Sequence, residues 1–322
     1  MEHRRKRNFA IKQGFRQSMG KTISFHRRYY AYSGGHQKVR DYIDHFLAFN
    51  HSVLLYTEGQ AETNPNLFSD ISRVTTQNKY APQHAELVFL AGMDWNAYLS
   101  TRAEHSTIIN LIQHVRHADR QNPLFNFLSK PAIRLCVSET VKNAIQPYAN
   151  GPCHTINMGI RLPKVERNKE TDLYILASKQ PKLGNAIYSW AQRKGIKTIL
   201  HSDKQTRNEV INAMANSRIT VALPNETEGF FLPSLEAMYY SDVAIIPYCI
   251  VNKEYHHPLS NLVVPEYDEE NIKSEILNAL TMPKWQLAAK RYIGRKIVKR
   301  YSLHSEREAL RKVISLYSCL PE

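Results

Sequence analysis

The feature that most constrains the fold is a regular alternation of short β-rich runs with helical stretches along most of the 322 residues. In the first half, strands are expected at 21–32, 52–56, 86–90, 107–112 and 132–137. The stretch between the first two carries Val39, Tyr42, Ile43, Phe46 and Leu47 at helical spacing, which predicts an amphipathic helix over 36–49. Strands that alternate with helices predict a parallel sheet with both faces covered.

The second half repeats this rhythm after a polar, charged segment at 161–171, which is the expected linker. Strands are expected at 173–176, 197–200, 219–223 and 243–247, with helices at 186–194, 209–215, 233–240 and 271–280. This is the doubly wound pattern, and the chain is long enough for two cores. We therefore expect an α/β protein of two Rossmann-like doubly wound domains, 1–165 and 166–290, with a ligand cleft between the carboxyl ends of their strands.

The end of the chain, 285–317, is expected to be helical and is basic. Trp285, Ala289, Tyr292 and Ile293 recur at helical spacing and are expected to form its buried stripe.

Composition excludes several classes of protein. Apolar residues make up 43 %, enough for each half to bury a core. No apolar run is long enough to predict a membrane-spanning helix, and none follows the basic N-terminus as a secretory signal would require. The cysteines lie far apart in the sequence without metal-type pairing, which predicts a reduced, cytoplasmic setting. They are Cys136, Cys153, Cys249 and Cys319.

The formal charge of +14 is concentrated at the two ends. Residues 1–40 hold eleven Lys and Arg with one acid, and residues 284–322 hold ten with three. A nucleic-acid binder usually carries its basic residues on the binding fold itself, so nucleic acid is not the expected partner. The basic ends are expected to bind an anionic membrane surface, which would make this a peripheral protein at the inner face of the membrane. Solvated tails and helix faces are an equally open interpretation.

The most informative segment is 228–238, Glu-Gly-Phe-Phe-Leu-Pro-Ser-Leu-Glu-Ala-Met, which follows an expected strand and opens an expected helix. Pro233 suits a first helical turn. A helix start attracts an anion such as a diphosphate, and Gly229 lets the backbone approach a ligand closely. The carboxylates of Glu228 and Glu236 can accept hydrogen bonds from vicinal hydroxyls at two ends of one ligand. The alternative is a surface turn with a capping Glu.

This segment resembles the E-x7-E signature of the retaining glycosyltransferase family 4, whose members have the GT-B fold. Seven residues separate Glu228 from Glu236, as in the family, although Phe231 stands where the family usually has a second Gly. The resemblance implies that Glu228 contacts the donor sugar and that Glu236 holds the ribose hydroxyls. The rest of the segment would line the sugar and diphosphate pocket: the backbone of Gly229, Phe230 and Phe231, and the amides of Leu232 and Pro233.

The same family places a basic pair after the first strand of its second domain, where it binds the donor diphosphate. Lys179 fits the first position and Lys182 the second, although lysines are also common in solvated turns. A cation held there stabilises the charge that develops on the leaving group more than it stabilises the bound substrate.

Two positions in the first half complete the implied site. Gly34 and Gly35 resemble the family's glycine loop facing the cleft, although a plain tight turn would also explain them. Members of the family often carry a histidine near the end of the strand expected at 107–112, close to the donor sugar. His114 resembles that residue, and Arg116 and His117 are the alternatives for its position. The family's final helix crosses back onto the first domain, so 291–322 is expected to do the same and to bring the two basic ends together.

The implied activity is metal-independent transfer of a hexosyl or related group, with retention, from a nucleotide-diphosphate sugar to a saccharide or lipid-linked acceptor in cell-surface polysaccharide or glycolipid assembly. No Asp-x-Asp stands at a strand end, so neither a metal nor a cofactor beyond the substrate nucleotide sugar is expected. Another GT-B enzyme, an epimerase or a phosphorylase, is one alternative. A basic nucleic-acid- or membrane-surface-binding protein on a non-catalytic GT-B fold is the other.

Overall fold

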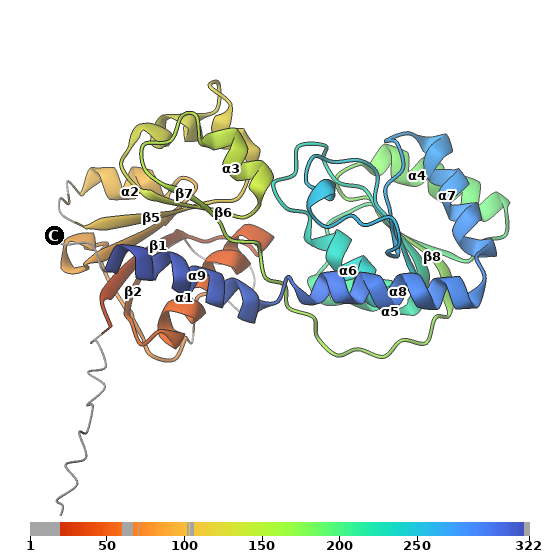
Figure 1. Ribbon diagram of the computed structural model, residues 1–322, viewed down its shortest axis with the longest axis horizontal. Helices are drawn as coiled ribbons and strands as arrows, with labels where there is room; N and C mark the ends of the chain where they lie inside the picture. Colours follow the sequence, from red (N-terminus) through yellow and green to blue (C-terminus); the bar gives the residue numbers. More distant parts are fainter. Residues whose placement is uncertain (1–19, 60–66, 70, 102, 104–105, 319–322) are drawn as a thin grey trace, which may run out of the picture.

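A computed structural model describes residues 20–59, 67–69, 71–101, 103 and 106–318 of the chain. Two parallel β-sheets lie one beyond the other along the longest axis of the molecule, and helices cover both faces of each sheet (Figure 1). The first sheet has the order β3-β2-β1-β4-β5-β6-β7 and the second the order β12-β11-β10-β8-β9. The predicted α/β fold of two Rossmann-like domains is confirmed.

The elements have the following bounds. The strands of the first sheet are β1 (Thr22–Arg28), β2 (Ser52–Glu58), β3 (Val74–Thr76), β4 (Leu87–Ala91), β5 (Thr107–Ile112), β6 (Ile133–Cys136) and β7 (Cys153–Thr155). Those of the second are β8 (Thr171–Leu176), β9 (Thr198–His201), β10 (Ser217–Ala222), β11 (Val243–Ile245) and β12 (Leu262–Val263). The α-helices are α1 (Gly34–Ala48), α2 (Asp94–Ser100), α3 (Glu139–Ile145), α4 (Pro181–Arg193), α5 (Arg207–Asn216), α6 (Leu232–Tyr240), α7 (Glu269–Thr281), α8 (Lys284–Lys299) and α9 (Leu303–Ser318).

Each sheet reverses its winding direction beside its first strand. In the first sheet β1 lies between β2 and β4, and in the second β8 lies between β9 and β10. Such a switch point opens a crevice at the carboxyl ends of the strands. The predicted boundary at 165/166 lies in the segment that joins the two sheets.

The first helix shows how local sequence sets these elements. The Ser33 hydroxyl accepts a hydrogen bond from the His36 N–H at 3.2 Å and so begins α1. The five apolar residues predicted for its inner face are all buried.

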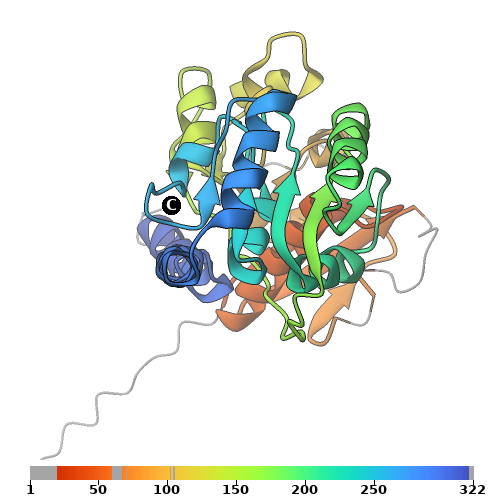
Figure 2. The same ribbon diagram turned by 90° about the vertical axis from the view of Figure 1, so that its right-hand side faces the viewer.

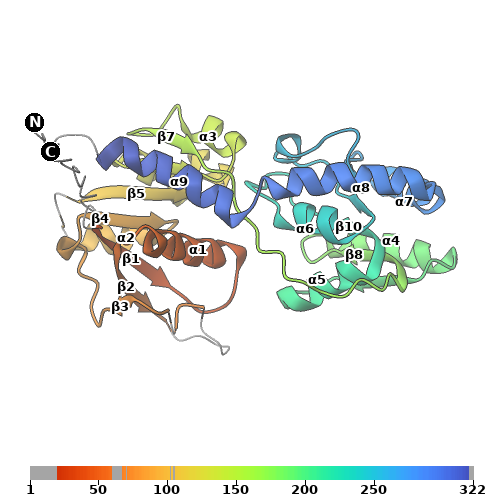
Figure 3. The ribbon, with the colours of Figure 1, turned by 60° about the horizontal axis from the view of Figure 1, so that its bottom comes forward.

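The C-terminal segment forms two helices, α8 and α9. The helical conformation is interrupted between α8 and α9. In this interruption Tyr301 is buried and Ser302 forms a parallel bridge with Ile160. The predicted division at 290/291 therefore falls inside α8. Beyond the break, α9 lies along the first domain beside α1 (Figure 3). There the buried Glu306 carboxylate accepts hydrogen bonds from Lys38 and His45, both at 3.0 Å.

The predicted buried stripe of α8 is wrong. Trp285 and Tyr292 are 74 % and 61 % exposed, Ala289 is exposed as well, and Ile293 is only half-buried. The buried residues of this helix are Leu287, Gly294, Ile297 and Val298. Both sets recur at helical spacing, so periodicity alone does not say which face turns inward.

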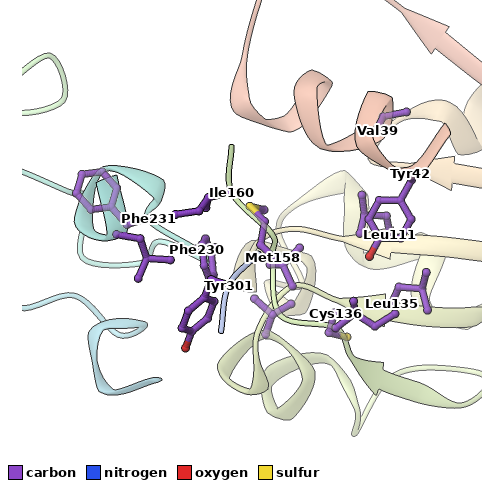
Figure 4. Packing of buried hydrophobic residues seen from close by; sticks show 14 of the residues in the cluster. Val39, Tyr42, Leu111, Leu135, Cys136, Met158, Ile160, Phe230, Phe231 and Tyr301 are labelled. Atoms are coloured by element: carbon purple, nitrogen blue, oxygen red, sulfur yellow. The ribbon is translucent and has the colours of Figure 1, made fainter. Parts of the chain in front are cut away.

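An apolar core continues from one domain into the other. Phe230 of the second domain packs against Tyr255 and Tyr301, with ring centroids 6.1 and 5.8 Å apart. Figure 4 shows Phe230 and Tyr301 beside Met158, which belongs to the end of the first domain. This shared core holds the two carboxyl-end crevices face to face. In the described part of the chain, no helix has the length and apolar content needed to span a membrane.

Candidate functional site

A cavity of about 500 Å³ lies between the two domains. It is lined from the first domain by the loop before α1 and the residues after β5, and from the second by the ends of β8, β9 and β10 and the start of α6. Its lining includes these predicted site residues: Gly34, Gly35, His114, Lys179, Glu228, Phe230, Phe231, Leu232, Pro233 and Glu236. Lys182 does not line it, because α4 begins at Pro181 and places Lys182 in an exposed first turn.

At Gly229 the backbones of the two domains lie close together. A Cβ built on it would lie 2.2 Å from the carbonyl oxygen of Gln113 and 2.7 Å from the Cα of His114. Its own carbonyl accepts a hydrogen bond from the Ser138 hydroxyl at 2.8 Å. A residue with a Cβ would clash here, so a glycine is needed for the backbone of the second domain to contact that of the first.

Glu228 is a buried carboxylate that is already partly satisfied. Its Oε1 accepts from the Lys179 ammonium and, at 3.2 Å, from the Asn225 N–H. No described residue donates to its Oε2. Lys179 also lies 5.0 Å from the ring centroid of Phe231, at cation–π distance. Lys179 and Glu228, each predicted separately as a site residue, thus form an ion pair in the cavity wall, and the Phe231 side chain, which replaces the family's second glycine, packs against the cation.

Glu236 is held in the same way by a residue that sequence reasoning missed. Its Oε1 accepts from Arg207 Nη2 at 2.8 Å and Nε at 3.2 Å, and no described residue donates to Oε2. Arg207 also donates to the carbonyl of Arg161 in the linker. Lys204, in the loop before α5, donates to the Tyr32 carbonyl of the first domain at 3.3 Å. Both cations follow β9, and the rule that ligands lie at the carboxyl ends of strands could have indicated them.

The start of α6 presents fewer amides to the cavity than predicted. Pro233 has no N–H to donate, which corrects its predicted role. The Ser234 N–H is engaged by the Phe231 carbonyl at 3.0 Å. The residue before α6 makes no side-chain cap, and Leu232 is the first residue of the helix. The Leu232 N–H and the helix dipole remain as anion-attracting groups.

His114 faces the cavity as a neutral imidazole. Burial lowers its pKa, with Arg116 and Lys179 acting in the same direction against Glu228. Its Nδ1 accepts a hydrogen bond from the Arg116 N–H at 3.0 Å, so the ring proton is assigned to Nε2. The alternatives differ: Arg116 is exposed at the rim, and His117 is buried with its pKa lowered to about 3, mainly by burial.

The glycine loop is less constrained than Gly229. A Cβ on Gly34 would meet only the Leu232 side chain, at an ordinary 3.5 Å. On Gly35 it would lie 3.1 Å from Gln113 Oε1, and the Gln113 amide donates to the Gly35 carbonyl.

A second cavity, of about 620 Å³, adjoins the first within the N-terminal domain. Ser33, Gly35, Gln113, His114 and Arg116 line both cavities. Among the described residues, no group of three or more His, Cys, Asp or Glu has the arrangement of a metal site.

The chain was compared with known proteins. No protein-family model matches it, and no curated protein sequence does. Solved structures do match. Sucrose-phosphate synthase from Thermosynechococcus elongatus superposes with a TM-score of 0.71 at 10 % identity, covering 93 % of this chain and 100 % of that one.

Two further structures agree. HepE of Anabaena in complex with UDP-glucose gives a TM-score of 0.71 at 11 % identity, covering 92 % of this chain and 99 % of that one. The α,α-trehalose 6-phosphate synthase of Burkholderia multivorans gives 0.62 at 12 % identity, covering 93 % and 98 %. Identities this low establish the architecture alone, and that architecture is the GT-B fold of these glycosyltransferases.

Proposed function

We propose that this protein transfers a hexosyl group from a uridine-diphosphate sugar to a hydroxyl of a saccharide or lipid-linked acceptor, with retention of anomeric configuration, as members of glycosyltransferase family 4 do. The observation that carries the proposal is the pair of buried carboxylates, Glu228 and Glu236, in one interdomain cavity, each with one oxygen left unengaged by described residues. The solved complex of HepE with UDP-glucose, which has the same fold, supports uridine as the base.

The donor would lie along the start of α6. Glu236 Oε2 would accept from the ribose hydroxyls and Glu228 Oε2 from the hydroxyls of the sugar. The diphosphate would lie between them, near the Leu232 N–H and the positive end of the helix. Lys179 would exchange its contact with Glu228 for the diphosphate as negative charge develops there.

The acceptor would enter through the second cavity, which shares His114 with the first. Because the His114 pKa is lowered, the ring would be neutral and would donate a hydrogen bond from its Nε2–H to a sugar oxygen without placing a positive charge there. No side-chain base is assigned, and the leaving diphosphate would take the proton of the attacking hydroxyl. The basic ends would hold the enzyme at an anionic membrane that carries the acceptor, although Arg4, Arg5, Lys6 and Arg7 lie outside the described residues.

The experiment is a thermal-shift panel of nucleotides and nucleotide sugars on the wild-type chain and on Glu236→Ala. Ligands that bind the native state raise the melting temperature by mass action. A rise for uridine compounds that disappears in Glu236→Ala supports the donor site, and proton NMR of the product then reports retention or inversion. A flat panel with stabilisation only by polyanions would favour a non-catalytic binding protein.

A further inference from the structure

The outward face of α8 carries aromatic and basic side chains that the fold does not use. Trp285 is 74 % exposed, the largest exposure among the large hydrophobic residues described, and Tyr292 is 61 % exposed. At 3.6 residues per turn, these two share about a third of the helix circumference with other exposed residues. Those are Ala288, Ala289, Lys296, Lys299 and Arg300. We call these seven residues the α8 stripe.

The charge of the stripe has one sign. The α8 sequence contains no Asp or Glu. Two cations outside the stripe are engaged: Arg291 pairs with Asp242 at 2.8 Å, and Lys290 donates to the Pro258 carbonyl at 3.2 Å. Lys296 and Lys299 make no ion pair with any described residue, and Lys296 instead lies over the Tyr292 ring at 4.6 Å. The stripe is therefore uncompensated positive charge around two exposed aromatic rings.

The stripe is also placed where a flat surface could reach it. Figures 1 and 3 show α8 at an edge of the second domain, and Figure 2 views it nearly end-on at the margin of the molecule. No stripe residue lines either cavity described above, and proteins that bind a nucleic-acid strand usually hold it in a groove.

We propose that the α8 stripe docks the protein on an anionic lipid bilayer, with Trp285 and Tyr292 at headgroup level and Lys296, Lys299 and Arg300 against the lipid phosphates. Tryptophan and tyrosine favour this interfacial depth, and lysine and arginine near an anionic leaflet add electrostatic attraction. The proposal is independent of the donor chemistry, because no residue of the stripe lines the interdomain cavity.

The test is co-sedimentation of the full chain with vesicles of phosphatidylcholine alone or mixed with phosphatidylglycerol. The variants are Trp285→Ala and the double change Lys296→Gln/Lys299→Gln. Removing one lysine contact should weaken partitioning roughly fivefold, so the double variant should bind about 25-fold more weakly. Trp285→Ala should also lose several-fold, and retention on pure phosphatidylcholine should be slight.

Matched controls lie on other faces. Tyr148→Ala removes an exposed aromatic ring of the first domain, and Lys194→Gln/Lys197→Gln removes two exposed lysines from the α4 side of the second domain. All should bind as the wild type does. Tryptophan fluorescence gives a direct readout, because Trp95 is buried, Trp190 is partly buried and only Trp285 is exposed. A blue shift on anionic vesicles should be absent in Trp285→Phe.

Several outcomes would overturn the proposal. One is equal binding to neutral and anionic vesicles. Another is that the stripe variants bind vesicles as the wild type does, whereas the quadruple change Arg4→Ser/Arg5→Ser/Lys6→Ser/Arg7→Ser abolishes binding. A third is a concentration-dependent dimer that Trp285→Ala dissociates. Salt-sensitive RNA binding through the same lysines without vesicle binding would also contradict it. Turnover of a water-soluble acceptor should not change in Trp285→Ala, so a failure here stays separate from a failure of the proposed transferase activity.

Discussion

The first domain faces the interdomain cavity with glycines, a neutral imidazole and one exposed cation at the rim, Arg116, whereas the second faces it with paired carboxylates and cations. Glu228 and Glu236 are buried, and each is paired with a cation from its own domain, Lys179 or Arg207. On the opposite wall, burial keeps His114 neutral. The two domains share one architecture, yet the charged recognition of a ligand is concentrated in the second. The first contributes shape, a close backbone contact and a neutral hydrogen-bond donor.

The sharpest test of this comparison removes one group from each wall. Lys179→Ala should lower kcat by about 10²–10³, the range typical of a lost donor to a developing charge. His114→Ala should cost only about fivefold, because a hydrogen bond from a neutral group contributes about 1 kcal/mol net. Steady-state kinetics with a uridine-diphosphate sugar would measure both. Equal losses would mean that the first domain takes part in charge stabilisation.

The next largest effect concerns the glycines of the two walls. Gly229→Ala should lower kcat/KM about 100-fold, because its Cβ meets the Gln113 backbone at 2.2 Å. This contact must displace segment 228–238, which we call the donor turn, or move the domains apart. Gly34→Ala is the matched control, since its Cβ meets only the Leu232 side chain at 3.5 Å. Kinetics and small-angle scattering of both variants would test the contrast. A tolerated Gly229→Ala would show that the domains are not required to meet at this point.

Part of this comparison could be predicted from the sequence. The donor turn is a contiguous segment whose proline, glycine and carboxylates carry local meaning, so Glu228, Gly229 and Glu236 were found together. Arg207 was missed because its contact with Glu236 is tertiary and spans 29 positions in the chain. The short strands β3, β7 and β12 were missed because each has only two or three residues and, unlike the equally short β11, does not lie in an apolar run of four residues.

The α8 helix shows where periodicity misleads. Trp285 and Tyr292 were assigned to the buried face because aromatic residues at helical spacing usually pack inside. In the structure, Leu287, Ile297 and Val298 form that face. The small Gly294 permits a close approach to Asn261, whose amide donates to the Met238 carbonyl at 2.9 Å. Which stripe turns inward depends on that neighbour, which lies outside the helix sequence.

A smaller effect tests the charge pairs of the second domain. Glu236→Gln keeps the shape of the side chain but removes its charge, so the donor KM should rise about 10- to 100-fold with the loss of a charged acceptor. Glu226→Gln, an exposed carboxylate on the same turn, is the control and should change the donor KM little. If both variants behaved like the wild type, the ribose would have to be held elsewhere.

The smallest effect concerns the pH dependence of the first domain. Burial lowers the pKa of His117 to about 3, and burial with the nearby Arg27 lowers that of His36 to about 4. Both groups titrate near 6.5 in the unfolded chain. The unfolded state therefore binds more protons below pH 6.5, and stability should fall as pH drops from there towards the folded pKa values. Above pH 6.5 neither group should contribute a slope.

For His117 the expected slope is about 1.4 kcal/mol per pH unit once the unfolded chain is protonated, and His36 adds less because it is only half-buried. Urea midpoints between pH 7.5 and 5 would measure the slope in wild type, His117→Gln and His201→Gln, before most carboxylates titrate. His117→Gln should flatten it. His201 is a half-exposed histidine of the second domain whose pKa is also lowered, so its variant should change the slope less. If His201→Gln changed the slope more than His117→Gln did, the pH dependence of stability would come mainly from a histidine of the second domain. That result would contradict the division between the two walls.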